Sequence, residues 1–178
     1  MRFTLTTASV LSLLALATAR VIRRDIPTII QDLTQINTDI GSLSAAVYSY
    51  SGGLPAALEI QTQEAAVERS LDQASADVNG TAVFTASESS RVTEALTQLE
   101  PVMRSSIAAL VLKRNLFITA GVGSTIRTNL HALRVKTDGL SVALQAKAAG
   151  ADKETIRQGT GDVDDAYDNA IDAYDMQM

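Results

Sequence analysis

Seven apolar side chains recur at alternating intervals of four and three residues between positions 29 and 50 of the chain. They are Ile29, Leu33, Ile36, Ile40, Leu43, Val47 and Tyr50. On an α-helix this spacing places all of them on one face, so the segment predicts a long amphipathic helix with a continuous apolar stripe. Such a stripe must be covered by neighbouring helices, by a ligand held between helices, or by an apolar surface outside the protein.

Helical periodicity continues along the chain, and no segment alternates with a period of two for long enough to predict a strand. We therefore predict an all-α fold, an antiparallel bundle of about five amphipathic helices joined by short loops. The predicted helices cover residues 26–50, about 54–78, about 86–115, about 124–148 and from 153 onward, with a connection at 117–123.

Local signals support several of these boundaries. Asp25 can cap the first helix, and Thr85 with Glu88 has the spacing of a capping box at the start of the third. Gly150 is expected to end the fourth helix, and Asp152 can cap the fifth.

Two residues interrupt the regular pattern. Pro101 lies inside the third helix, so we expect either a kink there or a break into two pieces. Glu64 falls on the apolar face of the second helix, and we interpret it as drift of the helical register rather than as a buried acid.

The first residues have the features of a secretory signal peptide. Arg2 is followed by an apolar run at 10–17, and Ala17-Thr18-Ala19 has the small-x-small pattern that signal peptidase accepts. We predict a signal peptide at 1–19, cleaved after Ala19. The apolar run is too short to span a bilayer, so the chain is expected to be secreted.

A basic pair, Arg23-Arg24, stands between this signal and the first helix. It predicts a second cleavage after Arg24, which would remove a short pro-segment at 20–24. The mature protein would then be one helical-bundle domain at 25–178.

The charge of the mature chain excludes two classes of partner. Cleavage after Arg24 leaves 11 basic side chains against 20 acidic ones, a formal charge of −9. A protein that binds nucleic acid needs a basic face for the phosphates, and binding to anionic lipid headgroups needs one as well. We therefore expect no nucleic-acid partner and no docking on anionic membranes.

The chain has no cysteine, so its stability must come from a packed core rather than from disulfide bonds. One glycosylation sequon, Asn79-Gly80-Thr81, lies in a segment that we predict to be a loop. We expect Asn79 to be the glycosylation site.

The sequence offers little for catalysis. His131 is the single histidine, with Asp138 as the only nearby partner, and we interpret it as a surface or core-edge residue. The acidic cluster at 162–165 lacks the glycine and the terminal glutamate of a calcium loop, so a solvated helical face explains it better. We predict no catalytic residue, no metal site and no cofactor, and thus no enzyme.

Four segments together carry a resemblance to a known family. They are "DIPTIIQDLTQINTDIGSL", "LTQLEPVMRSSIAALVLKRNLF", "GVGSTIRTNLHALRVKTDGLSVALQAK" and "VDDAYDNAIDAY". With the secretory signal and the dibasic junction before them, they resemble the fungal hydrophobic surface binding protein A and cell-wall galactomannoprotein family. The resemblance covers essentially the whole of the predicted mature chain.

This resemblance implies an extracellular or wall-associated helical domain without catalytic residues. Some relatives hold long-chain fatty acids between helices, and others adsorb to hydrophobic surfaces and bring a secreted polyester hydrolase to them. The present sequence lacks the Ser/Thr-rich stalk of wall-anchored relatives, which favours a freely secreted form.

Three hypotheses for the apolar stripes remain open: a cavity for a fatty-acid-like ligand, adsorption to hydrophobic surfaces, or a plain core in a structural wall protein or antigen. For a cavity, we predict that inward positions of the first, third and fourth helices line it. These are Leu33, Ile36, Ile40, Leu43, Leu99, Met103, Ile107, Leu110, Ile126, Leu130, Leu133 and Leu140. Hydroxyl groups that could anchor a carboxylate are those of Tyr50, Thr137 and Tyr174.

Overall fold

The computed structural model describes residues 25–176, and these fold into helices without any strand. The predicted signal peptide and both predicted cleavage points, after Ala19 and after Arg24, lie outside the described residues. The helices are α1 (Ile26–Ser49), α2 (Leu54–Asn79), α3 (Ala86–Leu112), α4 (Arg114–Thr119), α5 (Gly123–Lys147) and α6 (Gly150–Asp175). The all-α fold is therefore confirmed, with six helices in the described part of the chain where we expected about five.

The additional helix, α4, lies where the sequence predicted the end of the third helix and a connection. Lys113, at φ −92° and ψ 2°, separates α4 from α3. Phe117 then fixes the short helix to the bundle, because its fully buried ring stacks on that of Tyr50 with centroids 4.4 Å apart. Six residues are too few to show a periodicity of their own, so the sequence pattern could not reveal this helix.

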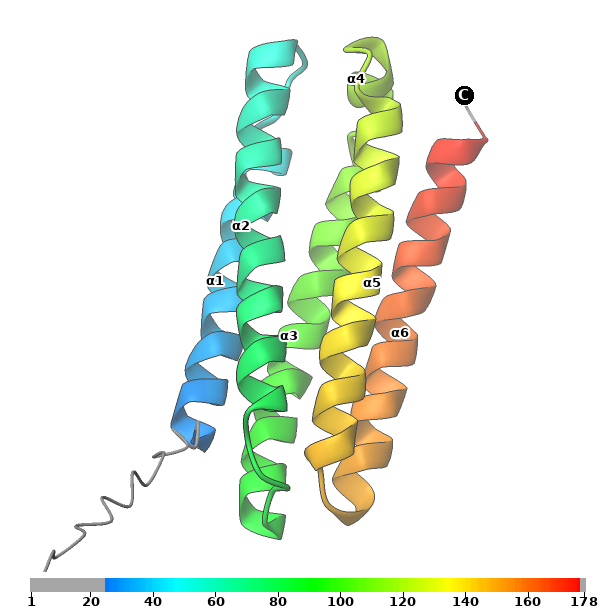
Figure 1. The fold of residues 1–178 in the computed structure, drawn as a ribbon. Coiled ribbons are helices and arrows are strands. Elements are labelled where there is room, and N and C mark those ends of the chain that lie inside the picture. The colour runs from blue at the N-terminus through cyan, green and yellow to red at the C-terminus, as the bar shows by residue number, and fades with distance from the viewer. Residues whose placement is uncertain (1–24, 177–178) are drawn as a thin grey trace, which may run out of the picture.

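The five long helices form a ring, in which each packs against two others (Figure 1). The order around the ring is α1, α2, α5, α6, α3 and back to α1. Consecutive long helices run antiparallel, whereas the pairs α1–α3, α2–α5 and α3–α6 run parallel (Figure 1). No loop joins α3 directly to α6, and packing together with hydrogen bonds such as that from the Tyr174 hydroxyl to the Leu110 carbonyl holds these two helices side by side.

The helix starts agree with the predicted caps in two cases. The Asp25 carboxylate accepts a hydrogen bond from the backbone N–H of Thr28 at 3.3 Å. At α3, the Thr85 hydroxyl accepts from the backbone N–H of Glu88, whose carboxylate in turn accepts from the N–H of Thr85. These bonds satisfy N–H groups that have no partner inside a helix.

The start of α6 was predicted wrongly. Gly150 begins this helix rather than ending the previous one, and Asp152 lies in its first turn instead of capping it. A residue of α3 fixes the connection between α5 and α6, because the Ser89 hydroxyl accepts a hydrogen bond from the N–H of Ala149 at 3.0 Å. A contact over 60 residues of sequence is not visible in a local pattern.

Of the two alternatives predicted at Pro101, a kink or a break, the break is wrong, because α3 is continuous across it. Proline has no N–H and so leaves the carbonyl of residue 97 without its helical donor. Both Thr97 and Pro101 are exposed, so water can reach that carbonyl and the helix can continue. A kink at Pro101 stays a prediction.

The apolar stripes meet in one core inside the ring. Every residue of the first stripe is at most 3% exposed. Within residues 25–176, none of the helices combines the length and the apolar character needed to cross a membrane.

Tyr174 joins α6 to the end of α3, and its removal tests this link. Its hydroxyl is fully buried and donates to the carbonyl of Leu110 at 2.8 Å. That burial raises the pKa of Tyr174, so the group stays a donor at all physiological pH values. Because Tyr174→Phe leaves a buried carbonyl unpaired, we expect the free energy of unfolding to fall by about 1–2 kcal/mol in urea denaturation.

The matched control is Tyr48→Phe on α1, since the side chain of Tyr48 is 52% exposed. It should leave the free energy of unfolding unchanged. Equal losses in the two variants would contradict a role for the Tyr174–Leu110 hydrogen bond.

Candidate functional site

A cavity of about 240 Å³ lies between α3, α5 and α6, with one residue of α2 behind them. Its walls are mostly apolar and come from residues 71–163. The lining residues are Leu71, Thr93, Leu96, Thr97, Leu99, Glu100, Met103, Thr137, Leu140, Ser141, Leu144, Thr155, Ile156, Gln158, Gly159, Thr160, Asp162 and Val163.

The lining residues divide into a buried floor and an exposed rim. The floor contains aliphatic side chains from all four helices, such as Leu71, Leu99, Leu140 and Ile156. The most exposed lining residues belong to only two helices: Thr97 of α3, and Thr155, Gln158 and Asp162 of α6. The cavity therefore opens to solvent between α3 and α6, two neighbouring helices that no loop joins directly.

The cavity exists because α6 carries small side chains on its inner face. Ile156 and Val163 are buried, but the positions one turn after Ile156 are Gly159 and Thr160. Opposite them on α5 is Ser141, whose hydroxyl lies 2.5 Å from that of Thr160. Large aliphatic residues at these places would fill the core, so their absence leaves the empty volume.

Most hydroxyl groups of the cavity wall already have partners. Thr97 donates to the carbonyl of Thr93, and Thr160 to that of Ile156. The Thr93 hydroxyl, in contrast, has no hydrogen-bond partner among the described residues, although Thr93 is only 8% exposed. Thr137, on the facing helix, lies close to the phenol of Tyr167 but without the geometry of a hydrogen bond.

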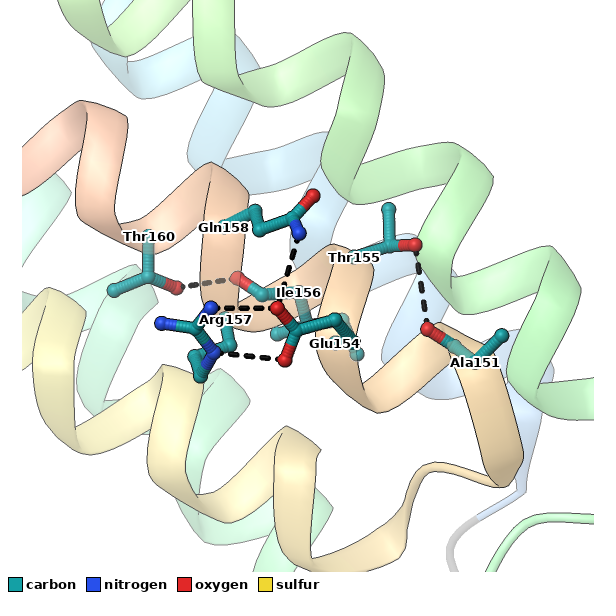
Figure 2. Close-up of polar contacts among 7 residues, drawn as sticks. All are labelled: Ala151, Glu154, Thr155, Ile156, Arg157, Gln158 and Thr160. Carbon is teal, nitrogen blue, oxygen red and sulfur yellow. Dashed lines mark hydrogen bonds and ion pairs between the residues drawn. The ribbon is translucent and has the colours of Figure 1, made fainter.

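The rim is acidic. Glu100 and Asp162 line it, and no basic residue does so among the described lining residues. Arg104 does not line the cavity, but its guanidinium pairs with the rim residue Glu100 at 3.2 Å. On α6, Figure 2 shows the guanidinium of Arg157 and the amide of Gln158 both bonded to Glu154.

A second, much smaller cavity surrounds Glu64 and corrects our interpretation of that residue. Its volume is about 10 Å³, and its lining residues are Leu43, Ile60, Glu64, Leu110, Ile126, Asn129, Leu130 and Leu133. Glu64 is 5% exposed, so it is a buried acid and not a sign of register drift. Its partner is the side-chain amide of Asn129 on α5, which donates to the carboxyl group.

Burial raises the pKa of Glu64 from 4.5 to about 7, although the hydrogen bond from Asn129 lowers it in part and Glu68 raises it further. One carboxyl oxygen, Oε1, has no hydrogen-bond partner within the described chain. The sequence could not predict this pair, because Glu64 and Asn129 are 65 residues apart.

The predicted cavity residues separate into three groups. Leu99, Met103, Thr137 and Leu140 line the larger cavity. Leu43, Leu110, Ile126, Leu130 and Leu133 line the smaller one. The remaining aliphatic positions, Leu33, Ile36, Ile40 and Ile107, are buried in the core and line neither of the two.

The other two predicted anchors already have partners inside the protein. The Tyr50 hydroxyl donates to the carbonyl of Gly53 at 3.4 Å, and Tyr174 donates to Leu110.

Sequence reasoning overlooked α6 as a wall of the cavity. The signal that could have revealed it is Gly159-Thr160, two small residues at inward positions of an otherwise apolar stripe.

The remaining predicted sites are at the surface. Asn79 is exposed at the last position of α2, rather than in a loop, and its glycosylation stays a prediction. His131 is exposed on α5. Within residues 25–176 no three His, Cys, Asp or Glu side chains are grouped to hold a metal ion.

Comparison with known proteins gives two sequence relatives and a family. Residues 26–146 match the family model of hydrophobic surface binding protein A. The chain is 28% identical to cell wall mannoprotein 1 of Aspergillus flavus over 148 residues, 80% of the chain and 51% of the relative. It is 26% identical to cell wall mannoprotein 1 of Aspergillus fumigatus over 162 residues, 90% of the chain and 55% of the relative. The chain thus spans about half the length of these curated relatives.

Solved structures share the fold. Afmp4p, crystallised in complex with palmitic acid, is 42% identical and superposes with a TM-score of 0.83 over 84% of this chain and 99% of its own. Ligand binding domain 2 of the Penicillium marneffei MP1 protein, complexed with multiple arachidonic acids, is 17% identical, with a TM-score of 0.80 over 86% of this chain and 97% of its own.

Proposed function

The chain belongs to the hydrophobic surface binding protein A family, and on this premise we propose that it is a secreted, non-enzymatic protein that holds the aliphatic chain of a lipid in the cavity between α3, α5 and α6. The observation that carries the proposal is the cavity itself. It has an aliphatic floor and a polar rim, which suits a molecule with a long tail and one polar end.

The two cavities follow one another along the long axis of the bundle. On α5, Leu133 of the smaller cavity is one turn from Thr137 of the larger one. On α2, Glu64 and Leu71 are about two turns apart. A tail that enters at the rim can therefore extend along the core towards Glu64, if Met103 and its aliphatic neighbours repack around it.

Relatives support this proposal and the extracellular location. Afmp4p was crystallised with palmitic acid, and the curated relatives are cell wall mannoproteins. We propose an extracellular or cell-wall location for this chain, without catalysis. Recruitment of a polyester hydrolase stays a prediction from the family resemblance.

Native mass spectrometry of the secreted protein tests the proposal. After incubation with a mixture of single-chain lipids that differ in their head groups, we expect one saturable adduct per chain. If no member of the mixture gives an adduct, the cavity is not a lipid site.

Adsorption to hydrophobic surfaces is the second candidate function, and it has an observation of its own. Tyr48, Leu54, Leu58 and Leu112 are 52–73% exposed at the end of the bundle where α1 and α3 end and α2 begins. A protein without any lipid adduct that still binds alkane droplets would favour this alternative.

A further inference from the structure

We propose that the bundle, if it holds an aliphatic tail as argued above, prefers a tail that carries a hydroxyl group at its far end, as in an ω-hydroxy fatty acid, and that Glu64 binds this hydroxyl. The inference rests on the proposed function and adds to it a polar contact at the inner end of the tail. It follows from the carboxyl group of Glu64, which lies in the core with one oxygen unpaired.

The two oxygens of the Glu64 carboxyl group differ in their surroundings. Oε2 accepts a hydrogen bond from the side-chain amide of Asn129, whereas Oε1 is buried and has no hydrogen-bond partner among the described residues. Polar groups inside a core are nearly always hydrogen-bonded, because an unpaired one loses its hydration without compensation. A hydroxyl that reaches Oε1 can donate to it and remove this loss.

The smaller cavity beside Glu64 suits a hydroxyl that is attached to a hydrocarbon chain. Its volume of about 10 Å³ is close to the minimum for one water-sized group. Apart from Glu64 and Asn129, its walls consist of six leucine and isoleucine side chains. A buried water molecule usually makes about three hydrogen bonds, which these walls do not offer, whereas the carbon atoms of an aliphatic chain fit against them.

The larger cavity provides the path to this group. On α2, Leu71 lines the larger cavity and Glu64 the smaller one, and on α3 the corresponding residues are Met103 and Leu110. Each pair is seven residues apart, which is about 10 Å of helix, so only a long tail can cross the larger cavity and reach Glu64. The buried side chain of Ile107 has to shift with flexible Met103 as the tail passes.

The carboxylate of such a ligand can remain in water at the opening between α3 and α6. The outermost rim residues are exposed, so a head group there keeps its hydration. The rim residue Glu100 adds no unpaired charge, because Arg104 pairs with it. In the inverted orientation the ligand carboxylate would lie beside the carboxyl group of Glu64, where two acidic groups oppose each other's ionisation. The hydroxyl is therefore the end that points inward.

The test compares three acids with the same sixteen-carbon chain at about pH 8, where fatty acids are ionised. Hexadecanoate, 16-hydroxyhexadecanoate and 2-hydroxyhexadecanoate would each displace a bound fluorescent lipid from the secreted protein. We expect 16-hydroxyhexadecanoate to bind at least about fivefold more tightly than hexadecanoate, because its hydroxyl pairs with a buried acceptor. The 2-hydroxy acid, whose hydroxyl stays at the rim, should bind like hexadecanoate. Binding of 16-hydroxyhexadecanoate no tighter than that of hexadecanoate would overturn the inference.

Variants of Glu64 show whether this residue provides the contact. Glu64→Leu replaces the acceptor by an aliphatic side chain, so the preference should reverse in favour of hexadecanoate. Glu64→Gln keeps a polar group at the same place and should keep the preference. The matched control, Glu59→Leu, removes an exposed carboxylate of the same helix that lines neither cavity, and it should bind all three acids like the unmodified protein. A Glu64→Leu protein with the full preference for 16-hydroxyhexadecanoate would contradict the role of Glu64.

The three acids also separate failure of the inference from failure of the proposed function. If none of them binds, the proposed function fails and the inference fails with it. If hexadecanoate binds and the 16-hydroxyl group brings no gain, the inference alone is refuted. Thermal unfolding checks that Glu64→Leu is folded, and Glu64→Met gives the same comparison if it is not.

Discussion

Replacing Gly159 by tryptophan is expected to lower lipid affinity by at least about tenfold without unfolding the bundle. Gly159 lines the cavity on α6, and a Cβ atom placed there would be 3.3 Å from Oε2 of Glu100 at the rim. The indole would therefore occupy the opening between α3 and α6. The Glu100 side chain is long enough to give way, so the backbone of α6 can keep its place.

Gly161→Trp is the matched control for this substitution. Gly161 is exposed on the same helix, does not line the cavity, and a Cβ atom there would have no atom within 4 Å. Both changes remove a glycine from a helix interior, so neither should destabilise α6 through helix propensity.

Displacement of a fluorescent lipid measures the affinity of the two variants, and thermal unfolding checks their folding. We expect loss of binding in Gly159→Trp and unchanged binding in Gly161→Trp. Undiminished binding by a folded Gly159→Trp protein would mean that lipid does not enter between α3 and α6.

Replacing Glu64 by glutamine is expected to stabilise the protein by about 3 kcal/mol above neutral pH and to have little effect in acid. Burial raises the pKa of Glu64 from 4.5 to about 7 in the folded protein. Between these two pH values the unfolded chain has lost the proton that the folded chain keeps. The free energy of unfolding therefore decreases as the pH rises from about 4.5 through about 7.

Glutamine has nearly the shape of a protonated glutamate and can still accept the hydrogen bond from Asn129. The free energy of unfolding of Glu64→Gln should thus lack this decrease. Urea denaturation at about pH 4 and about pH 8 measures the difference from the unmodified protein, which should be small at the lower pH and large at the higher.

The control is Glu59→Gln, at an exposed position of the same helix. It should change the free energy of unfolding only slightly, and by the same amount at both pH values. A Glu64→Gln protein with the same pH dependence as the unmodified protein would show that another group controls the stability in this range.

The fold was largely predictable because its signals are local. The stripe that begins at Ile29 and the capping box of Thr85 and Glu88 involve residues within one or two turns of each other, and the structure contains both. The errors involve contacts over long distances in sequence. Phe117 stacks on Tyr50 to fix α4, and Ser89 binds Ala149 at the start of α6.

The site was less predictable, because periodicity identifies which side chains point inward but not where they fail to fill the space. Ile40 and Leu140 are equally buried and belong to similar stripes, yet only Leu140 lines the larger cavity. The difference arises across helices, where Gly159 and Thr160 of α6 face α3 and α5. A single sequence does not show which helices become neighbours.

The packing of α6 against α3 has a consequence for the order in which the protein gains its proposed binding site. α6 is the last of the six described helices to be synthesised, and it provides one wall of the cavity and half of its rim. Until residues 150–163 have docked, the inner faces of α3 and α5 have no cover at this place. A nascent chain that ends before α6 therefore exposes apolar surface to other chains and lacks the cavity, so the docking of α6 is the step that completes the proposed site.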